Sequence, residues 1–493
     1  MLPVLTAAQM RACEQSCFES GVRSIDIMEN AARALAALIN RLKLDTCVFA
    51  CGAGGNGGDG YAAARLFAQS GGRAVILKVA EPRTEDAIRN AARAEEYVFA
   101  VTDISALDTL PRPDAWIDCV FGIGLNREVS GDAKKAIDRM NADRARGSRL
   151  ISCDIPSGLN ADTGEIMGAC VKADYTLCLH ALKSGLLLSE GKEMCGAIEI
   201  AAIGIDAKFM PEDCALLMEK ADAVKALPYR RQNAHKNDFG HLLIVAGSRG
   251  MAGAACMCAL GALRTGAGLV TVACPESIMP IVQITAPSAM CLPLPEENGA
   301  ISDAALPILS KALAGKTALA VGPGLSRACS EKVIALMLES GMNAVFDADA
   351  LNIISQNPEL IGKINAHHAL TPHPGEARRL TGLDMDAESQ LKALVSLGCA
   401  ALVKGATTVI SDGKQLVYSR SGCVGMAKGG SGDVLTGMAG ALLAQGLDPL
   451  RALTAASELH GLAGEEAEKR LGSVSMLPTD IINCICEVTR ADA

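Results

Sequence analysis

The sequence predicts two α/β domains, the first of them built on a doubly wound parallel sheet. Three observations lead to this fold class. The chain has 493 residues, too many for one ordinary domain. Short apolar runs of strand length alternate with helix-like segments along both halves. Half of the residues are hydrophobic, only 3% are aromatic and 49 are glycine. This composition suits helices packed on sheets through tight glycine turns, and it excludes disorder.

The first half begins with a helix-like stretch over residues 6–40, whose apolar residues recur at helical spacing. A strand is expected at 46–50, followed by a glycine-rich loop and an alanine-rich helix from Tyr61. Further strands are expected at 74–80, 115–121, 149–153 and 175–179. Buried strands that alternate with helices in this way are typical of a doubly wound parallel sheet.

The second half repeats the α/β pattern without an evident internal repeat of the first. Strands are expected at 242–246, 269–273, 317–321, 344–346, 369–370, 400–403 and 408–411. Helices are expected at 252–265, after Asp433 and before Arg470. A polar, locally basic stretch around residues 224–238 interrupts the two patterns. We therefore expect one domain over residues 1–222 and a second over residues 223–493.

Charge and cysteine content narrow the classes of protein. The net charge is −9 and no basic block occurs, which argues against nucleic acid and anionic membranes as partners. The longest charge-free run, 277–295, contains three prolines and is not expected to span a membrane. No positively charged segment precedes an apolar stretch at the start, so no signal peptide is expected. The nineteen cysteines form no CxxC pair, and we expect free thiols in a reducing cytoplasm.

The glycine loop of the first half fits the pattern GxGxxG between a strand and a helix, from Gly52 to Gly57. Alone, this is a weak indication of a dinucleotide site. Asp59 follows at the helix start, where its carboxylate would compete with a pyrophosphate for the same backbone amides. The alternative is that Asp59 caps the helix.

Two aspartates end neighbouring strands of the first half. Asp118 precedes the glycine turn Gly122-Ile123-Gly124, and Asp154 opens the segment Asp-Ile-Pro-Ser-Gly. Because such strand ends line the ligand crevice of open α/β sheets, Asn56, Asp118 and Ser157 could offer oxygen ligands to a cation. Asp154 could act on a proton of the bound ligand. The alternative is that all four are turn and cap residues.

The strongest local pattern of the second half is Gly-Gly-Ser-Gly-Asp over 429–433, directly before a helix. Glycines let the backbone approach a phosphate, and the amides of a helix start stabilise negative charge. Asp433 could then take the proton of an attacking hydroxyl. The alternative is a simple helix cap.

Other loops of the second half point to the same chemistry. The segment from Lys404 to Thr408 joins two strands and supplies a cation and hydroxyls for a nucleotide, unless it is only a hairpin-like turn. His373 stands between two prolines, which indicates a rigid surface loop. Asp347 and Asp349 end a strand, where they could contact substrate or a magnesium-bound phosphate, or cap the next helix. The pattern GxxxxGK[ST] is absent, so a Walker-type kinase is excluded.

Taken together, the loops of the first half resemble the signature segments of the NAD(P)H-hydrate epimerases, which implies a Rossmann-like domain. The matching segments are 54–60, 118–124, 154–158, 181–187 and 202–206. The family usually has Pro where Ala53 stands and Asn where Gly55 stands. The resemblance implies Asp154 as the catalytic acid and Asn56, Asp118 and Ser157 as potassium ligands. The implied contacts to the hydrated dinucleotide are Gly55, Asn56, Gly57, Gly58, Asp59, Gly122, Ile123, Gly124, Leu125, Asn126, Arg127 and Glu128.

The second half resembles the ribokinase-like fold and, within it, the ADP/ATP-dependent NAD(P)H-hydrate dehydratases. The matching segments are 236–240, 247–248, 264–269, 347–352, the loops of His373 and Lys404, and 430–433. The family commonly has Gly where Asn237 stands. The resemblance implies Asp433 as the base, with Gly324 and His373 also at the hydrated nicotinamide. The implied contacts to the adenine nucleotide are Lys404, Gly405, Ala406, Thr407, Thr408 and Gly432.

Both resemblances together imply a cytoplasmic enzyme that repairs hydrated NADH and NADPH. It would epimerise the two hydrates and dehydrate one of them at the expense of ADP or ATP, with magnesium at the nucleotide. Domains of this kind often assemble into homo-oligomers. A small-molecule kinase of the ribokinase-like type, fused to a dinucleotide-binding domain, is the alternative enzyme. A nucleotide-sensing protein without turnover would need Asp433 to be only a cap.

Overall fold

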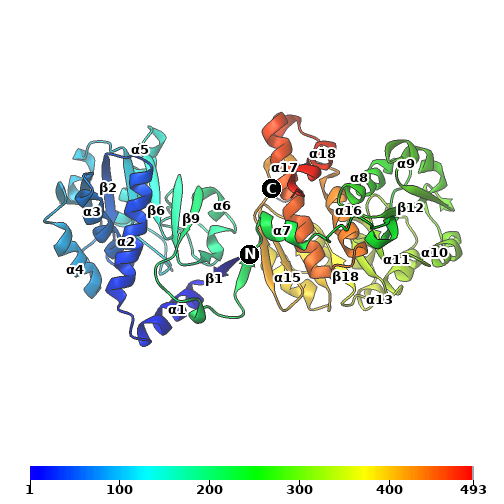
Figure 1. Ribbon diagram of the computed structural model, residues 1–493, viewed down its shortest axis with the longest axis horizontal. Coiled ribbons are helices and arrows are strands. Elements are labelled where there is room, and N and C mark those ends of the chain that lie inside the picture. Colours follow the sequence, from blue (N-terminus) through cyan, green and yellow to red (C-terminus); the bar gives the residue numbers. More distant parts are fainter. Residues whose placement is uncertain (491–493) are drawn as a thin grey trace. The chain divides into compact units, whose positions relative to one another are not determined.

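The computed structural model describes residues 1–490, which form two compact units (Figure 1). Residues 2–215 make up the first unit, and the second begins at Leu216 and also includes Met1. The division expected after Asp222 falls inside helix α7 (Lys220–Ala226), and the contacts of the chain divide before this helix.

A parallel sheet of seven strands forms the centre of the first unit, in the order β4-β3-β2-β5-β6-β7-β9. Every neighbouring pair is parallel, as predicted. The chain starts at β2 and runs outward in both directions, so the order reverses between β2 and β5, where open α/β sheets bind ligands. The strands are β2 (Thr46–Cys51), β3 (Arg73–Lys78), β4 (Ala100–Asp103), β5 (Ala115–Cys119), β6 (Arg149–Cys153), β7 (Tyr175–Leu179) and β9 (Ala197–Ala201).

Helices cover both faces of this sheet, which is why its central strands are apolar throughout. Phe49 of β2 faces α3 (Gly55–Gln69), where its ring lies 6.1 Å from that of Phe67. The alternate residue Val48 packs on the other face with Ile137 of α5 (Gly131–Ala145). Helices α2 (Ser24–Arg41) and α4 (Glu85–Ala94) flank α3 (Figure 1).

The single helix expected over residues 6–40 is two helices, and that prediction was wrong. Strand β1 (Leu2–Leu5) precedes α1 (Ala7–Glu19), and α2 follows only at Ser24. The break lies at Gly21, whose φ of +97° is a left-handed conformation that ends a helix. Strand β1 pairs in parallel with the short strand β8 (Leu182–Lys183).

The second unit contains a mixed sheet in the order β13-β12-β11-β16-β17-β18-β19-β20-β21-β10. Pairing is parallel from β13 to β19 and antiparallel through β20 and β21. The order reverses between β11 and β16. The strands are β10 (Ala215–Leu217), β11 (His241–Val245), β12 (Leu269–Pro275), β13 (Met290–Leu294), β16 (Ala318–Val321), β17 (Asn343–Phe346), β18 (His368–Leu370), β19 (Ala400–Val403), β20 (Thr408–Ser411) and β21 (Leu416–Ser419).

Helix α16 (Ser431–Ala444) is buried almost all round and packs against α8 (Ala252–Arg264), α17 (Pro449–Ser475) and the sheet (Figure 1). Gly437 permits the closest approach, because a Cβ at this position would lie 2.0 Å from the carbonyl oxygen of Cys258 in α8. This packing fixes α16 with its N-terminus at the carboxyl ends of the parallel strands. The helix end that the glycine-rich segment forms is therefore rigidly supported.

All nineteen cysteines are free, as predicted, and sixteen of them are buried. Within residues 1–490, no helix combines the length and the apolar character that crossing a bilayer requires.

Candidate active sites

The glycine loop of the first unit packs directly against the end of strand β5. A Cβ on Gly52 would lie 2.0 Å from the carbonyl oxygen of Val120, and one on Gly57 would lie 2.0 Å from that of Gly52. Only glycine fits at either position. The close packing brings Asn56, at the start of α3, beside the loop that follows β5.

An oxygen-rich cluster forms where these two loops meet β6. Asn56 donates from Nδ2 to the carbonyl oxygen of Phe121 at 2.8 Å. Ser157 donates from Oγ to Asp118 Oδ1 at 2.5 Å and accepts from the Phe121 amide at 2.8 Å. Burial raises the pKa of the fully buried Asp118 carboxyl, and hydrogen bonds from Ser157, Ser152 and Val120 oppose this shift. The three residues predicted as cation ligands are thus brought together.

One atom of this cluster lacks a partner. Asn56 Oδ1 is buried and accepts no hydrogen bond from any residue of the described chain. No group of three His, Cys, Asp or Glu side chains suited to a metal occurs within residues 1–490. A cation that is satisfied by neutral amide, hydroxyl and carbonyl oxygens with one carboxylate fits this donor set.

Asp154 lies beside this cluster and forms a buried ion pair. A Cβ on Gly122 would lie 3.5 Å from Asn56 Cβ and 3.8 Å from Asp154 Oδ2, so the three positions adjoin. Asp154 has a φ of +66°, and its Oδ1 accepts from the Lys183 ammonium and from the Leu179 amide. Its other oxygen, Oδ2, lies toward Gly122 and the loop that follows β5.

The sequence predictions missed Lys183, the partner of Asp154. Its side chain is completely buried in β8, and its Nζ also donates to the carbonyl oxygen of Leu179 at 2.7 Å. Burial lowers the pKa of Lys183, but the Asp154 carboxylate outweighs this and raises it above the ordinary value. A lysine within the apolar run 181–187 was the only available signal.

Two further carboxyl groups lie near Asp154. Gly54 is the N-cap of α3, so the interpretation of Asp59 as a helix cap is wrong. Burial, and then the charges of Asp154 and Glu14, raise the pKa of Asp59 well above its ordinary value. Burial and the charge of Asp154 also raise the pKa of Glu14, a residue of α1 that the sequence predictions did not include. Both carboxyl groups are therefore harder to ionise than free carboxyl groups, because they are buried beside the Lys183–Asp154 ion pair.

The loop after β5 borders the crevice with accessible backbone. Residues Gly124, Asn126, Arg127 and Glu128 are exposed, and Gly122, Ile123 and Leu125 are partly exposed. Arg11 of α1 donates to the Ile123 carbonyl oxygen at 3.5 Å. The predicted contacts in this loop, and Gly55 at the start of α3, are therefore open to a ligand, whereas Gly57, Gly58 and Asp59 are buried.

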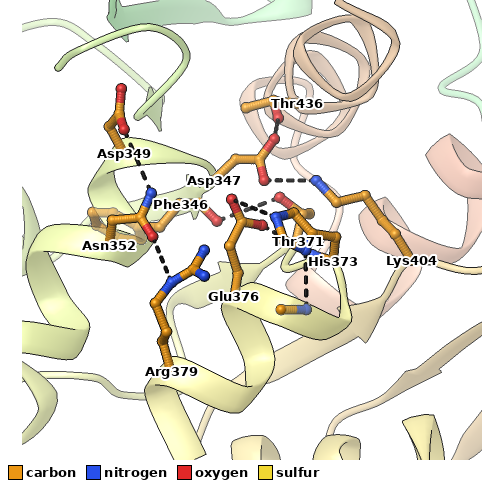
Figure 2. A network of polar contacts seen from close by, with 11 residues as sticks. Phe346, Asp347, Asp349, Asn352, Thr371, His373, Glu376, Arg379, Lys404 and Thr436 are labelled. Carbon is orange, nitrogen blue, oxygen red and sulfur yellow. Dashed lines mark hydrogen bonds and ion pairs between the residues drawn. The ribbon is translucent and has the colours of Figure 1, made fainter. Parts of the chain in front are cut away.

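In the second unit, Asp347 connects three elements that meet at the N-terminus of α16 (Figure 2). Its carboxylate accepts from Lys404 Nζ at 2.8 Å and from Thr436 Oγ1 at 2.6 Å, and only 1% of the residue is exposed. A Cβ on Gly432 would lie 3.3 Å from Lys404 Nζ. Lys404, Asp347 and the glycine-rich segment thus form one site.

Asp433 presents a carboxylate without a partner at this site. Gly430, with a φ of +106°, is the N-cap of α16, so the interpretation of Asp433 as a simple cap is wrong. Among residues 1–490, none forms a hydrogen bond or ion pair with the carboxylate of Asp433. Burial and the neighbouring Asp347 charge raise its pKa to about 7, while Lys404 opposes the shift. A carboxyl with this pKa can take up and release a proton near neutral pH.

His373 lies at the edge of the site and is half exposed (Figure 2). It is the N-cap of α14 (Pro374–Thr381), where Nδ1 accepts from the Gly375 amide at 3.0 Å and Glu376 Oε2 accepts from the His373 amide at 2.9 Å. The segment predicted as a loop is therefore half loop and half helix start. The Nε2 atom of His373 lies 3.5 Å from Glu376 Oε1.

The remaining predicted positions line the same edge of the sheet. Gly324, with a φ of +60°, follows β16, and its carbonyl oxygen accepts from Ser248 Oγ at 2.8 Å. The segment from Lys404 to Thr408 joins the antiparallel strands β19 and β20, so it is a hairpin turn that also delivers Lys404 to Asp347. Asp349 does not cap its own helix α12 (Asp349–Gln356), but accepts from the Ser326 amide at 2.9 Å.

The acids of the first unit lie at the strand-order reversal of its sheet, and those of the second lie beyond the carboxyl ends of β16 to β19. Two such groups of acids and close-packed glycines are typical of an enzyme with two active sites. The family model described as NAD(P)H-hydrate dehydratase matches residues 242–487, and the model described as YjeF-related protein N-terminus matches residues 24–185. Full-length relatives that are 33–34% identical are bifunctional NAD(P)H-hydrate repair enzymes, and the chain belongs to this family.

Relatives of this family align with almost the whole chain. The bifunctional NAD(P)H-hydrate repair enzyme Nnr of Moorella thermoacetica is 34% identical and covers 99% of this chain and 96% of its own. The enzymes of the same name from Coxiella burnetii and Escherichia coli are 33% and 34% identical; they cover 96% and 90% of this chain and 96% and 84% of their own. The ADP/ATP-dependent NAD(P)H-hydrate dehydratase of Bacillus subtilis, co-crystallised with ATP/Mg2+, is 27% identical and covers 56% of this chain and 97% of its own, with a TM-score of 0.46.

Proposed function

We propose that the chain repairs hydrated NADH and NADPH, with the epimerase in the first unit and an ADP- or ATP-dependent dehydratase in the second. The observation that carries the proposal is Asp433, a carboxylate without a partner and with a pKa near 7, at a glycine-rich helix start next to Lys404. A base, an anion hole and a cation in this arrangement are what transfer of a phosphoryl group to a hydroxyl needs.

In the dehydratase site, Asp433 takes the proton of the substrate hydroxyl as that oxygen attacks the terminal phosphorus of the nucleotide. The new O–P bond forms while the bond to the leaving ADP or AMP breaks. The C–O bond of this phosphate ester then breaks, and inorganic phosphate departs with its electrons, driven by the ring nitrogen lone pair. Loss of a ring proton restores NADH or NADPH. Hydroxide is a poor leaving group at neutral pH, which is why the phosphoryl group is needed.

The surrounding residues hold the two substrates in place. The nucleotide is bound by the hairpin turn and by one glycine of the helix start, namely Lys404, Gly405, Ala406, Thr407, Thr408 and Gly432. The backbone amides at the start of α16 receive the transferring phosphoryl group. Gly324 and His373 contact the hydrated nicotinamide. Magnesium, when bound with ADP or ATP, would neutralise the negative charge of the nucleotide phosphates. The acidic Asp347 and Asp349 are the residues of this edge suited to that cation.

In the epimerase site, Asp154 moves a proton at the ligand, and its ion pair with Lys183 orients the carboxylate. Potassium fits the oxygen cluster of Asn56, Asp118 and Ser157, where the unpartnered Asn56 Oδ1 supports the assignment. The hydrated ring then lies against Asn56, Asp59 and the loop from Gly122 to Glu128. The dehydratase is stereospecific, so an epimerase in the same chain makes the other hydrate usable. Free, buried thiols suit action in the reducing cytoplasm.

The test supplies mixed hydrate epimers with ADP or ATP and follows the absorbance of the reduced nicotinamide. We expect full recovery with the wild-type chain. Asp433→Asn should abolish the nucleotide-dependent recovery and retain nucleotide binding. Asp154→Asn should leave only the slow conversion of the second epimer that occurs without enzyme. No recovery with either nucleotide would reject the proposal.

A further inference from the structure

The side chain of Lys428 ties the glycine-rich segment before α16 to the C-terminal end of α17. Its Nζ donates to the carbonyl oxygen of Val474 at 2.7 Å and to that of Met476 at 2.5 Å. Carbonyl groups at a helix end have no partner within the helix, and an ammonium group there also interacts favourably with the helix dipole. The Lys428 ammonium is therefore bound to α17, whereas that of Lys404 is bound to Asp347 within the site.

The backbone of Lys428 leads directly into the start of α16. Its carbonyl oxygen accepts from the amide of Ser431, the first residue of the helix, at 3.3 Å. Gly430, with its φ of +106°, packs so closely that a Cβ there would lie 3.0 Å from Pro478 Cγ, at the start of α18 (Pro478–Val488). The turn from Lys428 to Ser431 is thus held against residues 474–478 through both its side chain and its backbone.

The residues before this turn are held against the same part of the chain. The Gly425 amide donates to Glu468 of α17 at 3.1 Å, and a Cβ on Gly425 would lie 2.2 Å from Met476 Sδ. Gly432 and Asp433 follow the turn directly, in the first turn of α16. A displacement of the turn that Lys428 holds would therefore move the phosphoryl-binding amides and the base together.

We propose that Lys428 is a positioning residue for phosphoryl transfer, whose ammonium ties the turn before α16 to the end of α17 and so sets the positions of the Gly432 amide and the Asp433 carboxylate. The inference rests on the proposed dehydratase function. A lysine beside a phosphate-binding loop often contacts the phosphate itself, but the two carbonyl partners of Lys428 Nζ assign it no contact with the nucleotide. Misplacement of reacting groups by about 1 Å reduces turnover on the order of a hundredfold.

The experiment compares Lys428→Met and Lys428→Arg in the full chain, with rates expressed per molecule that binds ADP, so that loss of folded protein does not count as loss of kcat. We expect kcat of the dehydratase to fall about 10- to 100-fold in Lys428→Met, with the Kd for ADP, measured by calorimetry, within about threefold of wild type. Lys428→Arg keeps a cation that can donate to both carbonyl groups and should recover most of the lost kcat.

Arg230→Met is the matched control. Arg230 also donates to a backbone carbonyl at a helix end, that of Gly266 after α8, and its guanidinium lies 3.9 Å from the centroid of the Phe239 ring. Gly266 precedes β12, so this contact lies at the opposite edge of the sheet from the site. The substitution should leave kcat unchanged.

Three results would overturn the inference. The first is a kcat in Lys428→Met within about threefold of wild type, or a loss no larger than in Arg230→Met. The second is a Kd for ADP raised about tenfold or more in Lys428→Met, because Lys428 would then contact the nucleotide itself. The third is a Lys428→Arg variant as slow as Lys428→Met. A wild-type chain without dehydratase turnover would instead reject the proposed function.

Discussion

At the scale of single residues, the protonation of Asp433 decides the dehydratase reaction. The base must be ionised to accept the substrate proton, and its pKa is raised to about 7 by burial and by Asp347. We therefore expect dehydratase kcat/KM to rise about tenfold per pH unit up to about pH 7 and then to level off. Initial rates with purified hydrate and ADP measure this profile. A flat profile between about pH 5.5 and 8 would contradict the role of Asp433.

The raised pKa of Asp433 also makes the folding stability of the second unit depend on pH. The folded unit holds the Asp433 proton more tightly than the unfolded chain, since the pKa rises from 3.8 to about 7 on folding. The stability from this group is complete below about pH 4 and is lost as pH rises through about 7. Asp433→Asn should therefore raise the thermal midpoint of its unit at pH 8 and leave it nearly unchanged at pH 4. An equal effect at both values would sink this explanation.

Replacing Lys183 should strongly lower both the folding stability of the first unit and its epimerase activity. Lys183→Met leaves Asp154 buried without its counter-ion, and breaking a buried pair in this way costs about 3–5 kcal/mol. We expect epimerase activity to be lost and the unfolding midpoint in urea to fall. The exposed Lys172→Met should behave as wild type. Asp154→Asn combined with Lys183→Met should regain stability but not activity, because no unpaired charge remains.

Sequence patterns predicted those site residues that share a short segment with glycines. Asp118, Asp154 and Asp433 each stand at the end of a strand or the start of a helix beside a glycine turn. Lys183 and Glu14 reach the first site from elements that carry no such pattern. Their roles depend on tertiary packing, which no local spacing encodes.

At the scale of elements, close approach between loops sets the first crevice. Gly52→Ala would place a methyl group 2.0 Å from the Val120 carbonyl oxygen, whereas Gly54→Ala meets nothing within 4 Å. We expect the first substitution to cost about 3 kcal/mol or more and the second well under 1 kcal/mol. Urea unfolding of both variants measures the difference. Equal effects would mean that the loop does not pack on β5 as the structure has it.

The strand predictions held where both faces of a strand are buried and failed at the edges of the sheets. Strands β6, β7, β19 and β20 begin and end at the predicted residues, because continuous apolar runs mark them clearly. Strands β4 and β9 were missed, since they are edge strands that are largely half exposed or exposed. The break between α1 and α2 was missed because apolar spacing continues across it.

At the scale of the whole molecule, the two sites should be separable. Asp154→Asn should abolish epimerisation and leave dehydration of the accepted epimer at the wild-type rate, and Asp433→Asn should do the reverse. Each acid lies in its own compact unit, with its own sheet and its own strand-order reversal. Assays with each resolved epimer measure both rates. Loss of both activities in either variant would contradict two independent sites.

The most direct test of the account follows the products of the second site. The wild-type chain, the accepted hydrate epimer and ADP or ATP are incubated, with reduced nicotinamide measured by absorbance and phosphorus species by NMR. We predict equal amounts of reduced nicotinamide, inorganic phosphate and the shortened adenine nucleotide, all abolished in Asp433→Asn. A stable phosphorylated hydrate without recovery of reduced nicotinamide would show a small-molecule kinase instead, and would contradict the repair function.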